Sequence, residues 1–114
     1  MTTDPRAAIA ASDTALGIEF GSTRIKAVLI GPDHEVLATG GHSWENQLRD
    51  GLWSYTLDQV RDGLRDAYAA LVADVRERYG TTPTSYGCIG VSAMMHGYLA
   101  FDADDRQIAP FRTW

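Results

Sequence analysis

The stretch GIEFGSTRIKAVLI, residues 17–30, brings together residue types that can bind phosphate. A glycine lets an anion approach the backbone because it has no Cβ, hydroxyl groups can donate hydrogen bonds, and cationic side chains add charge-assisted bonds. The residues of these kinds are Gly21, Ser22, Thr23, Arg24 and Lys26. We interpret them as a phosphate-binding turn in which Gly21, Ser22 and Thr23 bind the anion and Lys26 or Arg24 adds charge.

Glu19 lies just before this turn, inside an otherwise apolar run. An ionised carboxylate cannot donate a hydrogen bond to phosphate, but carboxylate oxygen is a ligand that Mg²⁺ prefers. We therefore expect Glu19 to hold Mg²⁺, directly or through a water molecule. The simpler alternative is a β-hairpin on which Glu19 is only an exposed acid.

Three short apolar runs separated by turn residues predict strands at 15–20, 25–31 and 34–43. Loops of two to four residues cannot make a parallel crossover, so these strands should form an antiparallel meander. Residues 1–13 are small and polar and show no periodicity, which predicts a flexible N-terminal tail.

A long helix is predicted from Leu57 to Tyr79, where apolar residues recur at helical spacing. A capping box begins at Thr56, and Gly80 is placed to end the helix. The run 86–92 after the helix predicts a buried strand parallel to an earlier one, and residues 98–102 predict a further strand. The fold class is therefore α/β with a mixed sheet.

Composition excludes several classes of protein. The formal net charge of −5 argues against a nucleic-acid surface and against an anionic-membrane surface, both of which need a basic patch. The sequence has no run long enough to cross a membrane and no recognisable signal peptide. The single cysteine, Cys88, excludes an intrachain disulfide framework and fits a reducing cytoplasm.

Three segments in the same order and spacing resemble motifs of the FGGY carbohydrate kinases, a family of the ribonuclease H-like, actin-like ATPase superfamily. GIEFGSTRIKAVLI resembles the first phosphate loop of that family, although Glu19 stands where the family usually has Asp. IGVSAMMHGYLAFD resembles the segment that ends in Gln-Met-His-Gly, and IAPFRTW resembles a segment that ends in Trp. The resemblance covers residues 14–114 and implies the first part of the N-terminal domain of such a kinase.

The resemblance implies that ATP and Mg²⁺ are cofactors and that Met95, His96 and Trp114 bind the sugar. It implies transfer of the ATP γ-phosphate to a sugar or polyol hydroxyl, the acceptor being a ketopentose such as xylulose or ribulose. Ala93-Met94 replaces the usual Gly-Gln, which bears on the identity of the sugar. The catalytic base of the family lies far downstream, so we expect these 114 residues alone to be inactive.

Two other functions fit parts of the sequence. A metal-dependent nuclease of ribonuclease H-like fold also has an acid on its first strand, but it needs acids on later strands, and the run 86–92 has none. A half-domain would expose apolar sheet and helix surface, so a non-catalytic chain that self-associates as a homo-oligomer is the other possibility.

Overall fold

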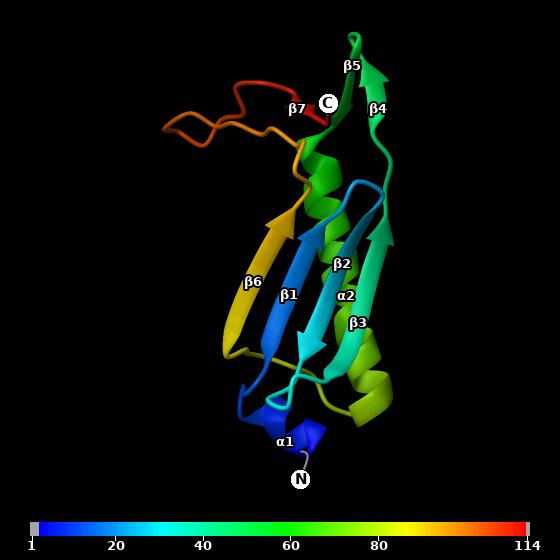
Figure 1. Ribbon diagram of the computed structural model, residues 1–114, viewed down its shortest axis with the longest axis vertical. Helices are drawn as coiled ribbons and strands as arrows, with labels where there is room; N and C mark the ends of the chain where they lie inside the picture. The colour runs from blue at the N-terminus through cyan, green and yellow to red at the C-terminus, as the bar shows by residue number, and fades with distance from the viewer. Residues whose placement is uncertain (1–2, 114) are drawn as a thin grey trace.

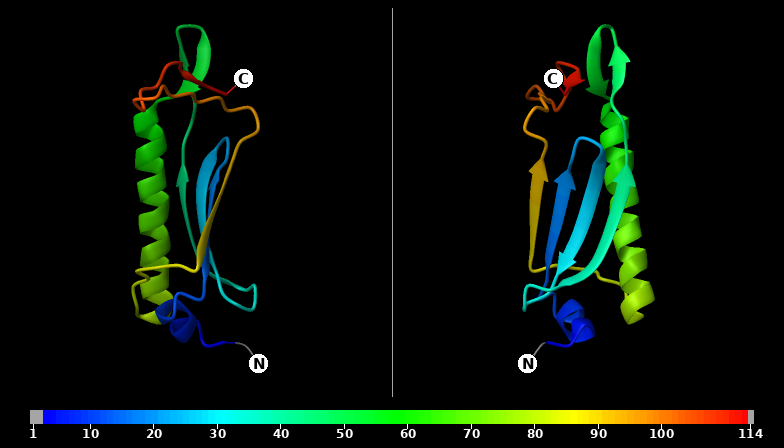
Figure 2. Two further views of the ribbon diagram at one scale, coloured as in Figure 1. Left: turned by 90° about the vertical axis from the view of Figure 1, so that its left-hand side faces the viewer. Right: turned by 45° about the vertical axis from the view of Figure 1, so that its right-hand side comes forward.

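The computed structural model describes residues 3–113. Its elements are α1 (Pro5–Ala10), β1 (Ala15–Phe20), β2 (Arg24–Ile30), β3 (Val36–Ser43), β4 (Gln47–Arg49), β5 (Leu52–Tyr55), α2 (Leu57–Tyr79), β6 (Cys88–Ala93) and β7 (Phe111–Arg112). Helix α2 lies along one face of the main sheet, and the views in Figures 1 and 2 show no helix on the other face. The predicted α/β class is confirmed.

The main sheet has the strand order β3-β2-β1-β6. Strands β1, β2 and β3 form the predicted antiparallel meander, and β6 returns after α2 to pair in parallel with β1. Because β1 and β6 are parallel, their carboxyl ends lie at the same edge of the sheet, where Phe20 is opposite Ala93. The turn after Phe20 therefore lies beside the segment that follows β6 (Figure 1).

Helix α2 begins and ends where the sequence predicts. Thr56 and Gln59 form both hydrogen bonds of a capping box, and Gly80 ends the helix in the left-handed conformation. The helix packs very closely on β3, because a Cβ at Gly40 would lie 2.3 Å from both Ala67 O and Leu71 N of the helix backbone. Fully buried Leu71 extends this contact into the core.

The N-terminal segment is not a flexible tail throughout. Residues 5–10 form the short helix α1, which starts with Pro5 in its first turn, where proline is well tolerated. Ile9 is buried and belongs to the core cluster. The sequence-based prediction was wrong here because a helix with one large apolar residue shows no periodicity, and its stability comes from tertiary contact.

Strand β6 pairs as predicted, but it is not buried. It lies at the edge of the sheet, so Ile89 and Val91 are 61% and 66% exposed. Cys88, at its start, is also exposed. The predicted strand at 98–102 is reduced to isolated bridges, from Tyr98 to Arg112 and from Phe101 to Gln107.

A second small sheet, β4-β5-β7, stands beyond the carboxyl edge of the main sheet (Figure 1). Its β4–β5 hairpin turns at Asp50 and Gly51, both of which have positive φ, as a type I′ turn requires. Strand β7 pairs with β5, placing Phe111 opposite Tyr55. This sheet therefore brings the end of the chain back to the turn that follows β1.

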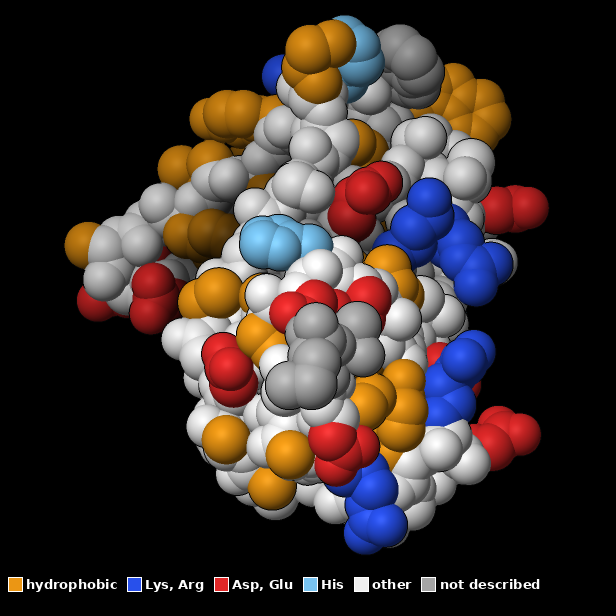
Figure 3. Space-filling model, turned by 60° about the horizontal axis from the view of Figure 1, so that its bottom comes forward, with side chains coloured by type: hydrophobic (Ala, Val, Ile, Leu, Met, Phe, Trp, Pro, Cys, Tyr) orange, Lys and Arg blue, Asp and Glu red, His pale blue; other side chains and the backbone are white. Residues whose placement is uncertain are grey.

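The opposite end of the molecule carries α1 and the β2–β3 turn. Figure 3 shows acidic and basic side chains interspersed there rather than gathered into one patch of a single sign. Among residues 3–113, no helix is both long enough and apolar enough to cross a membrane.

Candidate functional site

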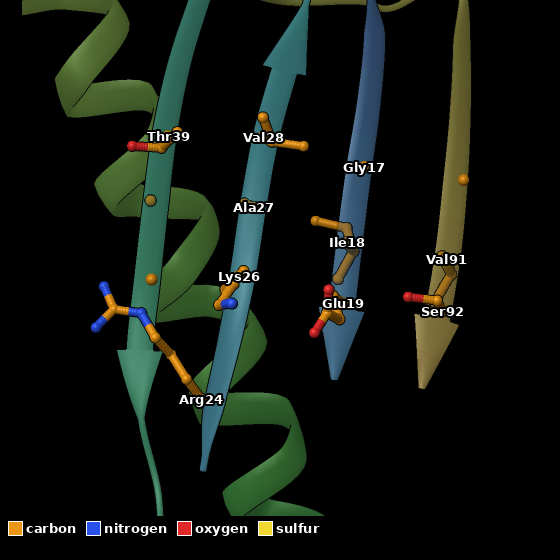
Figure 4. A pocket seen from close by; sticks show the side chains of 13 residues that line it. Gly17, Ile18, Glu19, Arg24, Lys26, Ala27, Val28, Thr39, Val91 and Ser92 are labelled. Carbon is orange, nitrogen blue, oxygen red and sulfur yellow. The ribbon is translucent and has the colours of Figure 1, made fainter. Parts of the chain in front are cut away.

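The open face of the sheet carries a row of polar side chains at equivalent positions of three strands. Glu19 of β1 is opposite Lys26 of β2 on one side and opposite Ser92 of β6 on the other. Figure 4 shows these side chains in a row across the sheet. On β1 and β2 burial alternates along the strand, since Ile18 and Ile25 are buried while Glu19 and Lys26 are exposed. Ser92 lies on the edge strand β6, all of whose residues are exposed. Strand periodicity therefore puts the acid on the side away from the helix.

This row lines an open hollow of about 790 Å³ on the sheet surface. Arg24 also lines it and reaches across β3 (Figure 4). A Cβ at Gly41 would lie 2.4 Å from an Nη of Arg24, so the missing side chain at Gly41 makes room for the guanidinium. Two cations and one carboxylate thus surround the same hollow, an arrangement that suits an anion bound together with a metal ion.

The turn from Gly21 to Thr23 closes the row at the carboxyl edge. Gly21 N donates to Arg24 O at 2.9 Å. A Cβ at Gly21 would lie 2.8 Å from the same carbonyl oxygen and 3.5 Å from a carboxylate oxygen of Glu19. The turn is therefore too tight for a side chain at this position, and Gly21 lies directly beside the carboxylate.

The three carbonyl groups of the turn are all held by aromatic residues. The indole Nε1–H of Trp44 donates to Gly21 O at 2.8 Å, and the backbone N–H of Trp44 donates to Thr23 O at 3.1 Å. The hydroxyl of Tyr55 donates to Ser22 O. Burial raises the pKa of Tyr55, so its hydroxyl keeps the proton that it donates.

Two N–H groups of the turn, those of Ser22 and Thr23, differ from that of Gly21, which donates to Arg24 O. A peptide group is planar and trans, so its C=O and N–H point in opposite directions. Because Gly21 O and Ser22 O face Trp44 and Tyr55, the N–H groups of Ser22 and Thr23 face away from them. Among residues 3–113, no hydrogen bond engages either N–H group. Two amides and two exposed hydroxyls at this edge are therefore available to donate hydrogen bonds to an anion.

Met95 and His96 lie at the same edge, just beyond β6. Met94 N donates to Phe20 O at 2.9 Å, which ties this segment to the end of β1. Met95 is 85% exposed, and His96 is exposed as well. Met95 and His96, which we predicted to bind the sugar, thus lie at the same edge of the sheet as the predicted phosphate-binding turn. Trp114, the third predicted sugar ligand, lies outside the described residues.

The sequence did not predict that Ser92 lies beside Glu19, or that Trp44 and Tyr55 hydrogen-bond to the turn after β1. Ser92 stands beside Glu19 only through the parallel register of β1 and β6, and no local pattern predicts a register. Trp44 and Tyr55 reach the turn through contacts across more than twenty residues. The presence of three aromatic residues in the segment 44–55 was the available signal.

The donor set at the open face suits Mg²⁺ bound mainly through a nucleotide. Mg²⁺ usually keeps several waters and takes one or two carboxylates together with substrate phosphates. Glu19 provides one exposed carboxylate of this kind beside the turn. Within the part of the chain that the structure describes, no group of three or more His, Cys, Asp or Glu side chains could form an all-protein metal site.

Comparison with solved structures places this fold among sugar and polyol kinases. A xylulose kinase from Brucella ovis superposes with a TM-score of 0.72 and 25% identity over 87% of this chain. A xylulose kinase from Rhodospirillum rubrum gives 0.67 and 20% over 88%, and a Plasmodium falciparum glycerol kinase with ADP gives 0.70 and 14% over 89%. The sequence significantly matches no protein-family model and no curated protein.

These likenesses confirm the resemblance to FGGY carbohydrate kinases at the level of the fold. The chain spans only 20% of the length of the Brucella, Rhodospirillum and Plasmodium kinases. The superposed region covers 87–89% of this chain.

Proposed function

We propose that the full-length protein is an FGGY carbohydrate kinase, which transfers the γ-phosphate of ATP to a hydroxyl of a sugar or polyol. The observation that carries this proposal is the arrangement at the carboxyl edge of β1. There, the N–H groups of Ser22 and Thr23, which have no hydrogen-bond partner among residues 3–113, follow a strand whose carboxylate is flanked by a lysine and a serine. The kinase neighbours support the reaction class, because this chain superposes on a part of each of them.

In this proposal the turn binds the phosphates of ATP. The N–H groups and hydroxyls of Ser22 and Thr23 donate to phosphate oxygens, and Gly21 permits the close approach. Lys26 and Arg24 neutralise part of the negative charge that the reaction redistributes over the transferred group. Phosphoryl transfer depends chiefly on such positioning and charge stabilisation, so these residues contribute without forming a covalent bond.

Glu19 would hold Mg²⁺ beside this turn, directly or through water. Mg²⁺ bound there would neutralise phosphate charge and orient the nucleotide. A glutamate is one methylene longer than the usual aspartate of the family motif, and the exposed position of Glu19 leaves room for that length. The base that accepts the hydroxyl proton of the substrate would come from outside this chain.

The acceptor would bind beyond β6, with Met95 and His96 forming its side of the site and Trp114 adding an apolar face. A ketopentose such as xylulose or ribulose is the sugar that we favour, because the Gln-Met-His-Gly segment that residues 89–102 resemble is best known in xylulokinases, and two of the similar solved structures are xylulose kinases. Such an enzyme would act in the cytoplasm, where ATP is available and an exposed thiol such as that of Cys88 stays reduced.

Glu19→Gln in the full-length protein tests the proposal. The substitution keeps the size of the side chain and removes its charge, so ATP-dependent sugar phosphorylation should fall at least about a hundredfold. Added Mg²⁺ should restore part of the loss. Glu77→Gln, at an exposed position of α2, is the matched control and should leave turnover unchanged. Unchanged turnover in Glu19→Gln would refute the role of Glu19.

Self-association of the 114-residue chain is a second candidate, supported by the exposure of Ile89 and Val91 on an edge strand. Light scattering tests it, and a monomer at all concentrations would contradict it. The nuclease alternative has less support, because the neighbours of Glu19 on both adjacent strands are Lys26 and Ser92 rather than further acids.

A further inference from the structure

We propose that Trp44 and Tyr55 are positioning residues for nucleotide binding, and that they hold the phosphate turn with its amides facing the substrate. The inference rests on the proposed kinase function for the identity of the ligand. Neither residue would touch ATP. Each acts through a carbonyl group of the turn, from the side opposite to the exposed amides.

The geometry of the turn requires such support. A turn that carries unpaired N–H groups can rotate its peptide planes, and each rotation would turn an amide away from the phosphate. Trp44 fixes the Gly21 and Thr23 carbonyls with its indole and backbone N–H groups, and Tyr55 fixes the Ser22 carbonyl between them. The peptide groups that contain the Ser22 and Thr23 amides are thereby fixed through their carbonyl oxygens, with the amides pointing away from Trp44 and Tyr55.

The two aromatic rings are themselves fixed by stacking. The rings of Trp44 and Tyr55 stack at a centroid distance of 4.0 Å and an interplanar angle of 20°. Phe20 packs against Trp44 at 6.4 Å, and Phe111 packs against Tyr55 at 5.5 Å. Trp44 and Tyr55 are 6% and 3% exposed. A donor on a packed, buried ring has little freedom, so the orientation of the carbonyls is fixed in advance of binding.

The aromatic residues that pack around Tyr55 also contact the segment proposed to bind the sugar. Phe111 packs beneath the segment that carries His96, because a Cβ at Gly97 would lie 2.8 Å from the Phe111 ring. Removal of the Tyr55 hydroxyl alone leaves this ring packing in place. The substitution should therefore weaken binding of the nucleotide and leave binding of the sugar unchanged. A general loosening of the site would weaken both.

Tyr55→Phe in the full-length protein is the decisive variant, since it deletes one donor and keeps the ring. We expect the KM for MgATP to rise about three- to tenfold, the effect of losing one hydrogen bond, while the KM for the sugar stays constant. Trp44→Phe removes the indole donor, and the double variant should show the larger defect.

Tyr79→Phe provides a matched control. Its hydroxyl donates to Leu37 O at 2.7 Å, so the substitution also deletes a tyrosine-to-carbonyl hydrogen bond, at the other end of β3. Tyr55→Phe and Tyr79→Phe should each reduce the melting temperature of the protein by a similar amount, but only Tyr55→Phe should change the KM for MgATP. An unchanged KM in both Tyr55→Phe and the double variant would overturn the positioning role and leave the kinase proposal intact.

Amide hydrogen exchange distinguishes this inference from the proposed function. The backbone N–H groups of Gly21 and Trp44 are hydrogen-bonded within the turn, to Arg24 O and Thr23 O, so their exchange reports how firmly the turn is held. If the unaltered protein phosphorylates no sugar, the kinase proposal fails, and the exchange rates at Gly21 and Trp44 still decide the role of the aromatic residues. Faster exchange there in Tyr55→Phe but not in Tyr79→Phe would support this role, and equal rates in both variants would refute it.

Discussion

Replacement of Gly21 by alanine is the sharpest test of the tight turn after β1. The added Cβ would lie 2.8 Å from Arg24 O, about 0.6 Å inside the 3.4 Å at which ordinary contact begins. The atom that it meets belongs to the backbone, and the same carbonyl accepts the closing hydrogen bond from Gly21 N at 2.9 Å. The turn must therefore open, because neither partner can rotate away.

The magnitude follows from these contacts. Opening the turn weakens one hydrogen bond, at about 1 kcal/mol, and adds overpacking strain of about 1–3 kcal/mol. The full-length Gly21→Ala variant should lose about 2–4 kcal/mol of unfolding free energy in urea. A displacement of several tenths of an ångström at the phosphate turn should also lower kcat/KM for ATP by at least about tenfold.

Gly41→Ala is the matched control for this substitution. It lies on the same open face, but its Cβ would meet the far end of the Arg24 side chain, which can swing aside. We expect a loss of unfolding free energy below about 1 kcal/mol and a smaller change in ATP kinetics. If Gly21→Ala and Gly41→Ala behaved alike in both assays, the reasoning from the turn geometry would be refuted.

Two further predictions concern stability. Gly40→Ala should destabilise the protein by about 1–3 kcal/mol or more in urea, because its Cβ would collide with the α2 backbone at Ala67 O and Leu71 N; an unchanged midpoint would contradict the close packing. The pKa of Asp74 is lowered by the hydrogen bond from the Thr39 backbone and then by Arg78. At pH values above the ordinary carboxyl pKa of about 3.9, Asp74→Asn should therefore lower the free energy of unfolding by about 1 kcal/mol. This difference between the variant and the unaltered protein should disappear as the pH falls through the lowered pKa that Asp74 has in the folded state. A difference independent of pH would exclude the charge as its cause.

The elements that the sequence predicts well are those with local determinants. Helix α2 has its capping box and its terminal glycine, and the strands of the meander are separated by short turns. The β4–β5 hairpin was missed although Asp50-Gly51 is a typical signal for a two-residue turn, because its flanking strands are too short to show alternation.

Features that depend on distant parts of the chain could not be predicted. Burial of the Ile89 and Val91 side chains depends on what covers an edge strand rather than on the apolar sequence, so the prediction of a buried strand failed. The same limit applies at the site. Glu19 and the glycine turn were found from residue types in one segment, whereas the contacts of Trp44 and Tyr55 with that turn depend on tertiary structure.

The parallel register of β1 and β6 also provides a place for a spectroscopic reporter. Cys88, the single cysteine of the chain, is exposed at the start of β6 opposite Ala15. The Phe20–Ala93 pair lies five residues further along, about 16 Å away at the usual rise of a strand. A spin label or dye attached to this thiol would sit clear of the turn and still within range to detect a nucleotide analogue that binds there.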